Sequence, residues 1–446
     1  MLIADSSARL PPHSPFPQLS GVPTQLHLAL AQFKPKKGDY TANLARIGRL
    51  IADAASLSPR PHVVQLPETA FTGYFLEGGV REAAVTAGQL ARDLDGAYRA
   101  AGGGKDAVAI DVVAGFYEIW QNSPYNSAMF VTIGGSEAPR IVHIHRKIFL
   151  PTYGMFDEER FVDRGLEIAA FDTTWGRAAM LVCEDAWHSL SGAIAALDGA
   201  QIVFVCAAAP ARGLWPRVGE APGPASVQRW DRLIRDIAEE HGIFATLTNL
   251  VGSEGGKMFG GGSFIVGPLG DVRGRAPVFE EALLQVSMDL ADLTRTRADM
   301  PLLSDLRTTL PHLRAQLARV EEGRTVTLEF DDVKSAVRSP QPAAKSEQLR
   351  AGEDDRLPVV RPAAVDHAGP PSLDVDGSLT EKWLVQFIRD EMSRRGFDRA
   401  VVGISGGLDS AVTAYLAAAA LGADKVLGLR LPYRSSRPGA NALRLT

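Results

Sequence analysis

The sequence predicts an α/β protein with a largely buried sheet, followed by a second and shorter α/β unit. Short apolar runs typical of strands alternate with segments of helical spacing up to about residue 290. A stretch rich in Pro, Ala and charged residues then interrupts this pattern, and a strand, a glycine-rich turn, a helix and a strand follow it. We therefore expect a large first domain, a linker and the start of a second domain.

The elements of the first domain follow from the spacing of its apolar residues. Leu44, Ile47 and Ile51, for example, share one face of a predicted helix. Strands are predicted at Leu26–Phe33, His62–Glu68, Ala107–Glu118, Ser127–Ile133, Ile141–Lys147, Arg177–Cys183, Gln201–Ala208, Ile243–Asn249 and Gly262–Gly267. Helices are predicted at Asn43–Ala55, Gln89–Ala101, Ser191–Ala200 and Val227–Gly242.

The rest of the chain divides at its change of composition. A helical stretch is expected at residues 302–322, and a capped helix with an apolar stripe at Ser378–Gly396. The expected limits are 1–24 for a disordered tail, 25–290 for the first domain, 291–334 for a helical extension, 335–375 for a linker and 376–446 for the second domain.

Composition excludes some classes of protein. The chain has 446 residues and a net charge of −5, which argues against a nucleic-acid or membrane-surface binder. No apolar stretch is long enough to span a membrane. Two cysteines, Cys183 and Cys206, cannot form a disulfide framework for a chain of this length, so we expect a reducing, cytoplasmic location.

Three reactive side chains stand at the ends of predicted strands. Glu68 follows one strand, Lys147 ends another and Cys183 ends a third. Ligands of α/β sheets bind outside the carboxyl ends of the strands, so these three groups could meet there. Taken singly, each has a plainer interpretation, because a cysteine at a strand end is usually a small buried side chain and a lone Glu or Lys is usually an exposed charge. Cys206, within an apolar strand, is expected to be buried and inert.

A carboxylate, an ammonium and a thiol suit the hydrolysis of an amide. The carboxylate can take the thiol proton during attack, and the ammonium favours the thiolate and stabilises the oxyanion. Attack gives a thioester and releases ammonia, and water then completes hydrolysis with the carboxylate as base.

The segments LPETAFTGYF, HRKIFLPTYGMFDEERF and LVCEDAWH, in this order, resemble the nitrilase or carbon–nitrogen hydrolase superfamily. The late segment GGGSFIVGPLGDV is similar to that family too. The resemblance implies a four-layer αββα sandwich without a cofactor, in which Glu68 is the base, Lys147 the cation and Cys183 the nucleophile. It also implies a second glutamate that orients the lysine, for which Glu158 fits best and Glu159 less well.

FLPTYGMFDEERF is most similar to the amidase domain of the glutamine-dependent NAD synthetase family. That resemblance implies that Tyr74 and Tyr153 line a glutamine site. The family usually has a serine at the position of Ala209, so one contact to glutamine is in question here. Arg212 or Arg217 could hold the substrate carboxylate, and the sequence does not choose between them.

The glycine-rich turn GISGGLDS predicts a phosphate site. Its glycines allow a ligand close to the backbone, its serines supply hydroxyls, and the helix that follows directs N–H groups at the turn. The plain alternative is a tight strand–helix turn. The turn resembles the pyrophosphate loop of ATP pyrophosphatases, which implies binding of ATP by residues Gly403, Ile404, Ser405, Gly406, Gly407, Leu408, Asp409 and Ser410. Asp409 is a candidate Mg²⁺ ligand.

The two resemblances together imply a glutaminase joined to an NAD synthetase, acting on glutamine, ATP and deamido-NAD. Ammonia from glutamine would aminate the adenylated carboxylate of deamido-NAD. The second domain is expected to be an incomplete doubly wound α/β unit, cut short near Ser436, and unable to make NAD by itself. The alternatives are a stand-alone amidase for another small amide and a nucleotide-binding remnant. Nitrilase-like domains commonly pair, which implies a homo-oligomer.

Overall fold

The computed structural model describes residues 24–102, 107–213, 224–322, 376–405, 407–430 and 442–444. The predicted tail up to residue 23, the linker at 335–375 and the chain around Ser436 lie outside the described residues. The chain divides into two compact units, one formed by Met1–Leu303 with Val375–Thr446 and the other by Ser304–Asp374.

Two mixed six-stranded sheets form the centre of the first unit. The first sheet has the order β14 (Ala282–Asp289), β1 (Gln25–Gln32), β2 (Val63–Gln65), β3 (Ile110–Trp120), β4 (Ser123–Ile133) and β5 (Arg140–Arg146). The second has the order β13 (Val272–Arg275), β12 (Phe264–Val266), β9 (Phe244–Asn249), β8 (Ile202–Ala207), β7 (Arg177–Val182) and β6 (Ala170–Asp172). In each sheet the three strands β1–β3 and β7–β9 run parallel, so their carboxyl ends lie at one edge.

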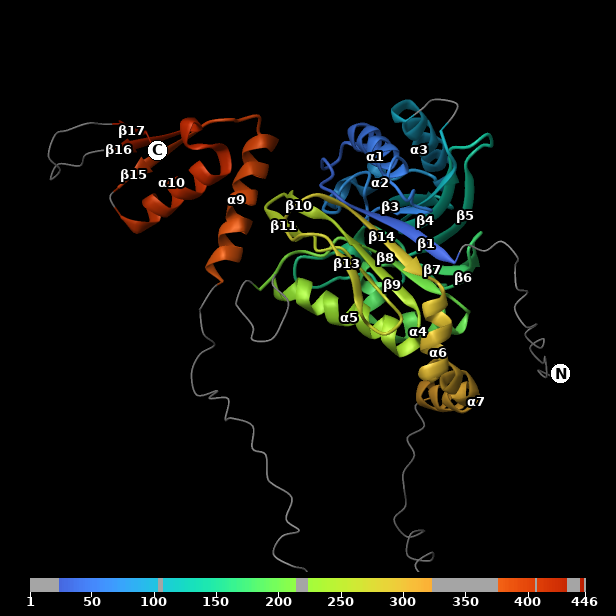
Figure 1. The fold of residues 1–446 in the computed structure, drawn as a ribbon. Helices are drawn as coiled ribbons and strands as arrows, with labels where there is room; N and C mark the ends of the chain where they lie inside the picture. Colours follow the sequence, from blue (N-terminus) through green and yellow to red (C-terminus); the bar gives the residue numbers. More distant parts are fainter. Residues whose placement is uncertain are drawn as a thin grey trace, which may run out of the picture. The chain divides into compact units, whose positions relative to one another are not determined.

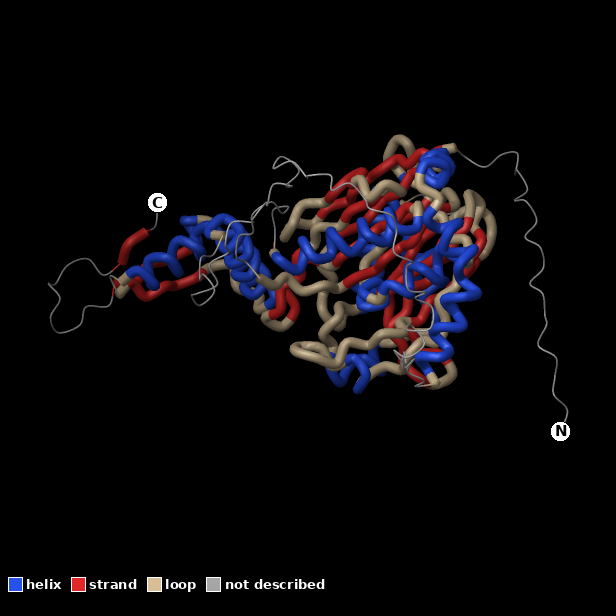
Figure 2. Tube along the Cα trace, turned by 90° about the horizontal axis from the view of Figure 1, so that it is seen from below, coloured by secondary structure: helices blue, strands red, loops and turns tan. Residues whose placement is uncertain are grey.

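The sheets pack face to face, and helices cover both outer faces (Figure 1). Alternate side chains such as Leu28, Phe130 and Phe204 fill the space between the sheets. Helices α1 (Tyr40–Ala55) and α3 (Ala87–Ala101) pack on the first sheet, and α4 (Ser189–Leu197) and α5 (Ala225–His241) pack on the second. Figure 2 shows the same helices and strands from below. The predicted four-layer αββα sandwich is confirmed.

Local sequence explains where these helices begin and end. Asp39 accepts the Ala42 N–H at the start of α1, and Thr86 accepts the Gln89 N–H at the start of α3. Helix α5 ends at Gly242, whose φ of 56° is the left-handed conformation that glycine adopts most easily.

Several short elements were absent from the sequence prediction. They are the helix α2 (Val80–Ala83), the strands β6, β13 and β14, the hairpin β10 (Val251–Glu254) and β11 (Lys257–Gly260), and the 3₁₀ turns Glu77–Gly79, Glu158–Arg160, Cys183–Trp187 and Ala423–Lys425. Helix α6 (Ala291–Asp299) lies within the predicted helical extension at 291–334. Strand β14 has a half-exposed apolar pattern, yet it pairs with β1 along the full length of both strands. Helix α7 (Leu302–Glu321) matches the predicted helical stretch.

The C-terminal segment forms a small three-stranded sheet with two helices. Strand β15 (Ala400–Ile404), helix α10 (Leu408–Leu421) and strand β16 (Val426–Arg430) make the predicted βαβ unit, with the two strands parallel. Helix α9 (Gly377–Arg394) precedes it. Strand β17 (Ala442–Arg444), which pairs with β16 in antiparallel fashion, was not predicted from the sequence.

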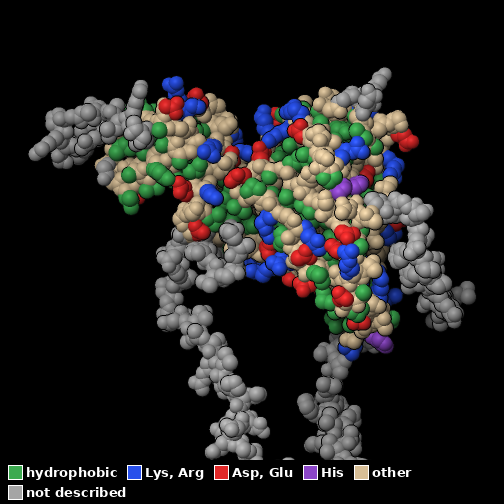
Figure 3. Space-filling view, viewed as in Figure 1, with side chains coloured by type: hydrophobic (Ala, Val, Ile, Leu, Met, Phe, Trp, Pro, Cys, Tyr) green, Lys and Arg blue, Asp and Glu red, His purple; other side chains and the backbone are tan. Residues whose placement is uncertain are grey.

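The surface mixes charges of both signs. Figure 3 shows Lys and Arg interleaved with Asp and Glu on the visible face, without a field of one sign. This agrees with the small net charge of −5. In the described part of the chain no helix is both long and apolar enough to cross a membrane.

Candidate active site

Glu68 lies just beyond β2, with its side chain fully buried. A Cβ on Gly115 of β3 would lie 2.4 Å from the Pro67 carbonyl oxygen, so only glycine lets β3 come this close to the Glu68 backbone. The next residue, Thr69, has a φ of 48°, which is strained for a β-branched side chain. The surrounding backbone thus holds the Glu68 carboxylate in one place.

Lys147 follows β5 and is enclosed by two carboxylates. Its Nζ donates to Glu68 Oε1 and to Glu158 Oε1, each at 2.9 Å. Burial alone would lower the Lys147 pKa, but the negative charges of Glu158 and Glu68 outweigh it and hold the pKa well above its ordinary value. Lys147 is therefore an ammonium in this site.

Glu158 is the better placed of the two candidate glutamates for a contact to Lys147. It is buried, whereas the neighbouring Glu159 is exposed and pairs with Arg164 at 2.8 Å. Burial raises the Glu158 pKa to about 7, against the opposing effect of the Lys147 charge. The carboxyl of Glu158 is therefore close to half protonated at neutral pH.

Cys183 begins a 3₁₀ turn directly after β7, and its φ of 48° is in the left-handed region. Burial and the Glu68 charge raise the pKa of the Cys183 thiol well above its ordinary value, and the Lys147 charge opposes them. The thiol therefore needs a base at the moment of attack. The structure places Glu68, Lys147 and Cys183 at one edge of the stacked sheets, close enough for their charges to act on one another. Cys206 lies fully buried in β8, as expected.

Asn126 joins the two carboxylates from a third side. Its Nδ2 donates to Glu68 Oε1 at 2.7 Å and to Glu158 Oε1 at 3.0 Å, and its backbone carbonyl accepts the backbone N–H of Lys147. The sequence analysis missed this residue. A polar side chain inside the apolar strand YNSAMFVTI was the available signal.

Asp185 was also missed, and it ties two strand ends together. Oδ1 accepts the N–H groups of Ile148 and Phe149, and Oδ2 accepts the Val182 N–H at 3.1 Å and contacts His145 Nε2 at 2.8 Å. The side chain is fully buried. It therefore fixes the segment after Lys147 against the turn that carries Cys183.

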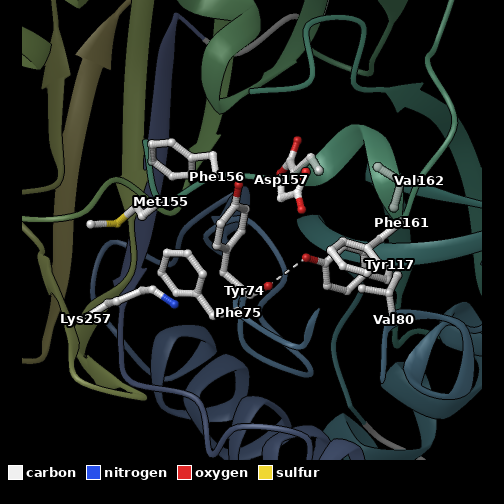
Figure 4. A pocket seen from close by; sticks show the side chains of 11 residues that line it. Tyr74, Phe75, Val80, Tyr117, Met155, Phe156, Asp157, Phe161, Val162 and Lys257 are labelled. Carbon is white, nitrogen blue, oxygen red and sulfur yellow. Dashed lines mark hydrogen bonds between the residues drawn. The ribbon is translucent and has the colours of Figure 1, made fainter. Parts of the chain in front are cut away.

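The two predicted tyrosines lie on different sides of the site. Tyr74 is buried beside Glu158 and lines a pocket of about 100 Å³. Figure 4 shows it next to Phe75 and Phe156, with the Tyr117 hydroxyl donating to the Tyr74 backbone carbonyl oxygen. Tyr153 is exposed and donates to Glu184 Oε2 at 3.0 Å. Tyr153 and Cys183 line a separate cavity of about 160 Å³. Phe156 lines both this cavity and the one beside Tyr74.

The cavity that Cys183 lines also includes Ala209, the position at which related sequences usually have a serine. Ala209 and Arg212 both line it, so the missing hydroxyl falls at the cavity wall beside Cys183. Arg217 lies outside the described residues.

The predicted phosphate loop joins β15 to α10. Ser410 Oγ accepts the Ser405 N–H at 3.2 Å and donates to the Gly407 carbonyl at 2.9 Å, which closes the turn. Gly406 lies outside the described residues. Asp409 is exposed in the first turn of α10, and the described residues contain no cluster of three or more His, Cys, Asp or Glu that could hold a metal ion.

Comparison with known proteins places this site in a class. The profile of the carbon–nitrogen hydrolase family matches residues 27–298, which is more than half of the chain, and the chain belongs to that family. The NAD synthase family matches residues 381–443.

The chain is also similar to two-domain synthetases. It is 25% identical to a glutamine-dependent NAD(+) synthetase of Aquifex aeolicus and 25% identical to that of Thermotoga maritima, in each case over 92% of this chain. It covers 61% and 60% of those proteins, so it spans about three fifths of their length. An NH(3)-dependent NAD(+) synthetase of Chlorobaculum parvum is 51% identical over 67 residues, which are 15% of this chain and 24% of that protein.

Solved structures support the same fold. The glutamine-dependent NAD+ synthetase of Acinetobacter baumannii matches with a TM-score of 0.62 and 21% identity, over 93% of this chain and 60% of that chain. A carbon–nitrogen hydrolase of Helicobacter pylori matches with a TM-score of 0.54 and 23% identity, over 64% of this chain and 96% of that chain.

Proposed function

We propose that this chain hydrolyses the side-chain amide of glutamine and supplies the ammonia for ATP-dependent amidation of deamido-NAD. The observation that carries the proposal is the buried Glu68–Lys147–Glu158 cluster beside the Cys183 thiol, in one chain with an NAD synthase match. The relatives that match 92% of the chain are glutamine-dependent NAD(+) synthetases, which supports glutamine as the substrate and NAD as the product.

The chemistry follows from the protonation states of these groups. Glu68 takes the proton of the Cys183 thiol as sulfur attacks the amide carbon, and the Lys147 ammonium stabilises the oxyanion. The protonated Glu68 then gives its proton to the leaving nitrogen, so that ammonia departs and a γ-glutamyl thioester remains. Water attacks the thioester with Glu68 as base, which yields glutamate and restores the thiol.

The C-terminal loop would bind the phosphates of ATP through its backbone N–H groups and the hydroxyls of Ser405 and Ser410. Asp409 would hold Mg²⁺ there, where a cation reduces the charge of the phosphates. Two free cysteines suit a reducing, cytoplasmic location. We also propose that the protein forms a homo-oligomer.

Release of ammonia from L-glutamine without ATP tests the first half of the proposal. The wild type should release ammonia, Cys183→Ala should release none, and Cys206→Ala should behave as the wild type because that thiol lies in β8, away from the cavity that Cys183 lines. Activity retained by Cys183→Ala would contradict the proposal. Adding ATP and deamido-NAD, with detection of NAD, tests the second half.

A stand-alone amidase for another small amide is the second candidate, and Ala209 favours it. The residue lines the cavity that Cys183 opens into and offers no hydroxyl to a substrate. A panel of ω-amides and simple aliphatic amides separates the candidates, since a glutaminase should prefer L-glutamine.

A further inference from the structure

The cavity that contains Cys183 has an uneven distribution of charge. Its volume is about 160 Å³, and aromatic and small apolar side chains make much of its wall. Among the described residues that line it, the charged groups are one carboxylate, from Glu184, and two guanidinium groups, from Arg212 and Arg229. The Tyr153 hydroxyl already donates to that carboxylate at 3.0 Å. The two arginines therefore give this cavity an excess of positive charge.

Arg212 lies over the segment that follows Lys147. Its Cζ is 5.4 Å from the centre of the Phe156 ring. The guanidinium also lies next to Gly154, where an added Cβ would be in ordinary contact with Arg212 Nη2, at 3.7 Å. The exposed Arg212 side chain thus lies at the cavity wall over an aromatic face, and its N–H groups are available to a ligand.

Arg229 is an exposed residue of helix α5 that also lines the cavity. Its Cζ is 5.9 Å from the centre of the Trp187 ring, and Trp187 packs edge-on against Trp230. The Arg212 N–H donates to Ser226 Oγ at 3.0 Å, so the Arg212 segment is tied to the first turn of the helix that carries Arg229. This hydrogen bond connects the backbone segment of Arg212 to helix α5, which carries Arg229.

Neither arginine has a carboxylate partner among the residues that the structure describes. Other arginines of the described residues do pair, as Arg164 does with Glu159 at 2.8 Å. Two unpaired guanidinium groups in one cavity with a nucleophile fit an anionic group on the substrate, for which arginine offers a forked set of donors.

We propose that Arg212 and Arg229 select amides that carry a free carboxylate, and that they replace the hydroxyl missing at Ala209. The substrate class is then an ω-amide of a dicarboxylic acid, with the amide at Cys183 and the carboxylate between the two guanidinium groups. This inference rests on the proposed amidase reaction at Cys183, and it deepens the choice of glutamine by naming the group that is recognised.

The test compares three amides with three variants. L-glutamine and glutaric acid monoamide carry the carboxylate, and butyramide lacks it. Arg212→Met and Arg229→Met should each raise KM for the first two by about tenfold or more, which is the usual loss for one hydrogen bond to a charged group. Their kcat, and the hydrolysis of butyramide, should stay near the wild-type values. Arg49→Met, an exposed arginine on α1, serves as the matched control.

The outcomes separate this inference from the proposed function. An unchanged KM for both carboxylate-bearing amides, or an equal loss for butyramide, overturns the inference while amidase activity stands. If the wild type hydrolyses no amide, the affinity of Cys183→Ala for L-glutamine, measured by calorimetry, tests carboxylate recognition separately from the reaction. Binding that weakens in the Arg212→Met background supports carboxylate recognition without the reaction, and absence of binding overturns both.

Discussion

Burial and the nearby Glu68 charge together favour the protonated form of Glu158. Glu68 and Glu158 both pair with the ammonium of Lys147. If both carboxyl groups were ionised, the cluster would carry a net charge of about −1. Burial raises the Glu158 pKa to about 7, so a proton on this carboxyl removes the excess near neutral pH. Glu158 and Lys147 then stabilise the site while Glu68 exchanges protons with Cys183.

Replacement of Glu68 by Gln tests its role as the base. The amide cannot accept the thiol proton, so ammonia release should fall by about 10²–10⁴-fold, the usual contribution of a general base. Glu159→Gln, in the exposed neighbour of Glu158, should stay within about twofold of the wild type. Equal rates for Glu68→Gln and the wild type would remove Glu68 from the mechanism.

The turn after β7 is positioned by one side chain. Asp185 accepts four hydrogen bonds or contacts from two strand ends, and an asparagine could accept on only one of its two side-chain heavy atoms. Asp185→Asn should therefore lower the free energy of unfolding by about 1–3 kcal/mol and also lower kcat. Denaturant unfolding and ammonia release measure the two effects, with exposed Glu167→Gln as the control. A variant with wild-type stability and lower kcat would assign Asp185 a direct role instead.

The β10–β11 hairpin carries a buried carboxyl that supports the Tyr74 loop. Glu254 Oε2 accepts the N–H groups of Tyr74 and Phe75, at 2.9 and 3.1 Å. Burial raises the Glu254 pKa from 4.5 to about 7. The folded state therefore binds this proton more tightly than the unfolded state, and stability falls as pH rises from about 4.5 to 7.

Glu254→Gln should remove that fall. Relative to the wild type, the variant should gain stability between pH 5 and pH 8, by at most about 3 kcal/mol. Thermal unfolding of both proteins across this range measures the difference, and the loop contacts remain because the Gln oxygen can accept the same N–H groups. A difference that does not change with pH would show that Glu254 does not titrate in this window.

At the scale of the whole molecule, the sequence predicted the parts that repeat a clear pattern. The long strands of both sheets and the helices α1, α3 and α5 have apolar residues at regular spacing, so their positions followed. The order of the four layers came from the resemblance to the nitrilase family. The hairpin β10–β11 was missed because four-residue strands rich in glycine and polar residues carry no period.

Some residues of the site were predicted from the sequence and others were not. Reactive residue types at strand ends pointed to Glu68, Lys147 and Cys183, and the structure places them together. Asn126 reaches Glu68 and Glu158, and Asp185 reaches His145 and Ile148, across at least 32 positions of sequence, and a single sequence holds no trace of such long-range contacts. The domain limits at 290, 334 and 375 stay predictions, as does binding of ATP and Mg²⁺ at Gly403–Ser410.

The thioester is the intermediate on which the whole account depends. Wild-type protein mixed with L-glutamine and quenched in acid should carry a γ-glutamyl group on the peptide that contains Cys183, detected by peptide mass spectrometry. Cys183→Ala should carry none, and the peptide that contains Cys206 should stay unmodified in every sample. Ammonia release without an acyl group on Cys183 at any quench time, or an acyl group on Cys206, would contradict the account.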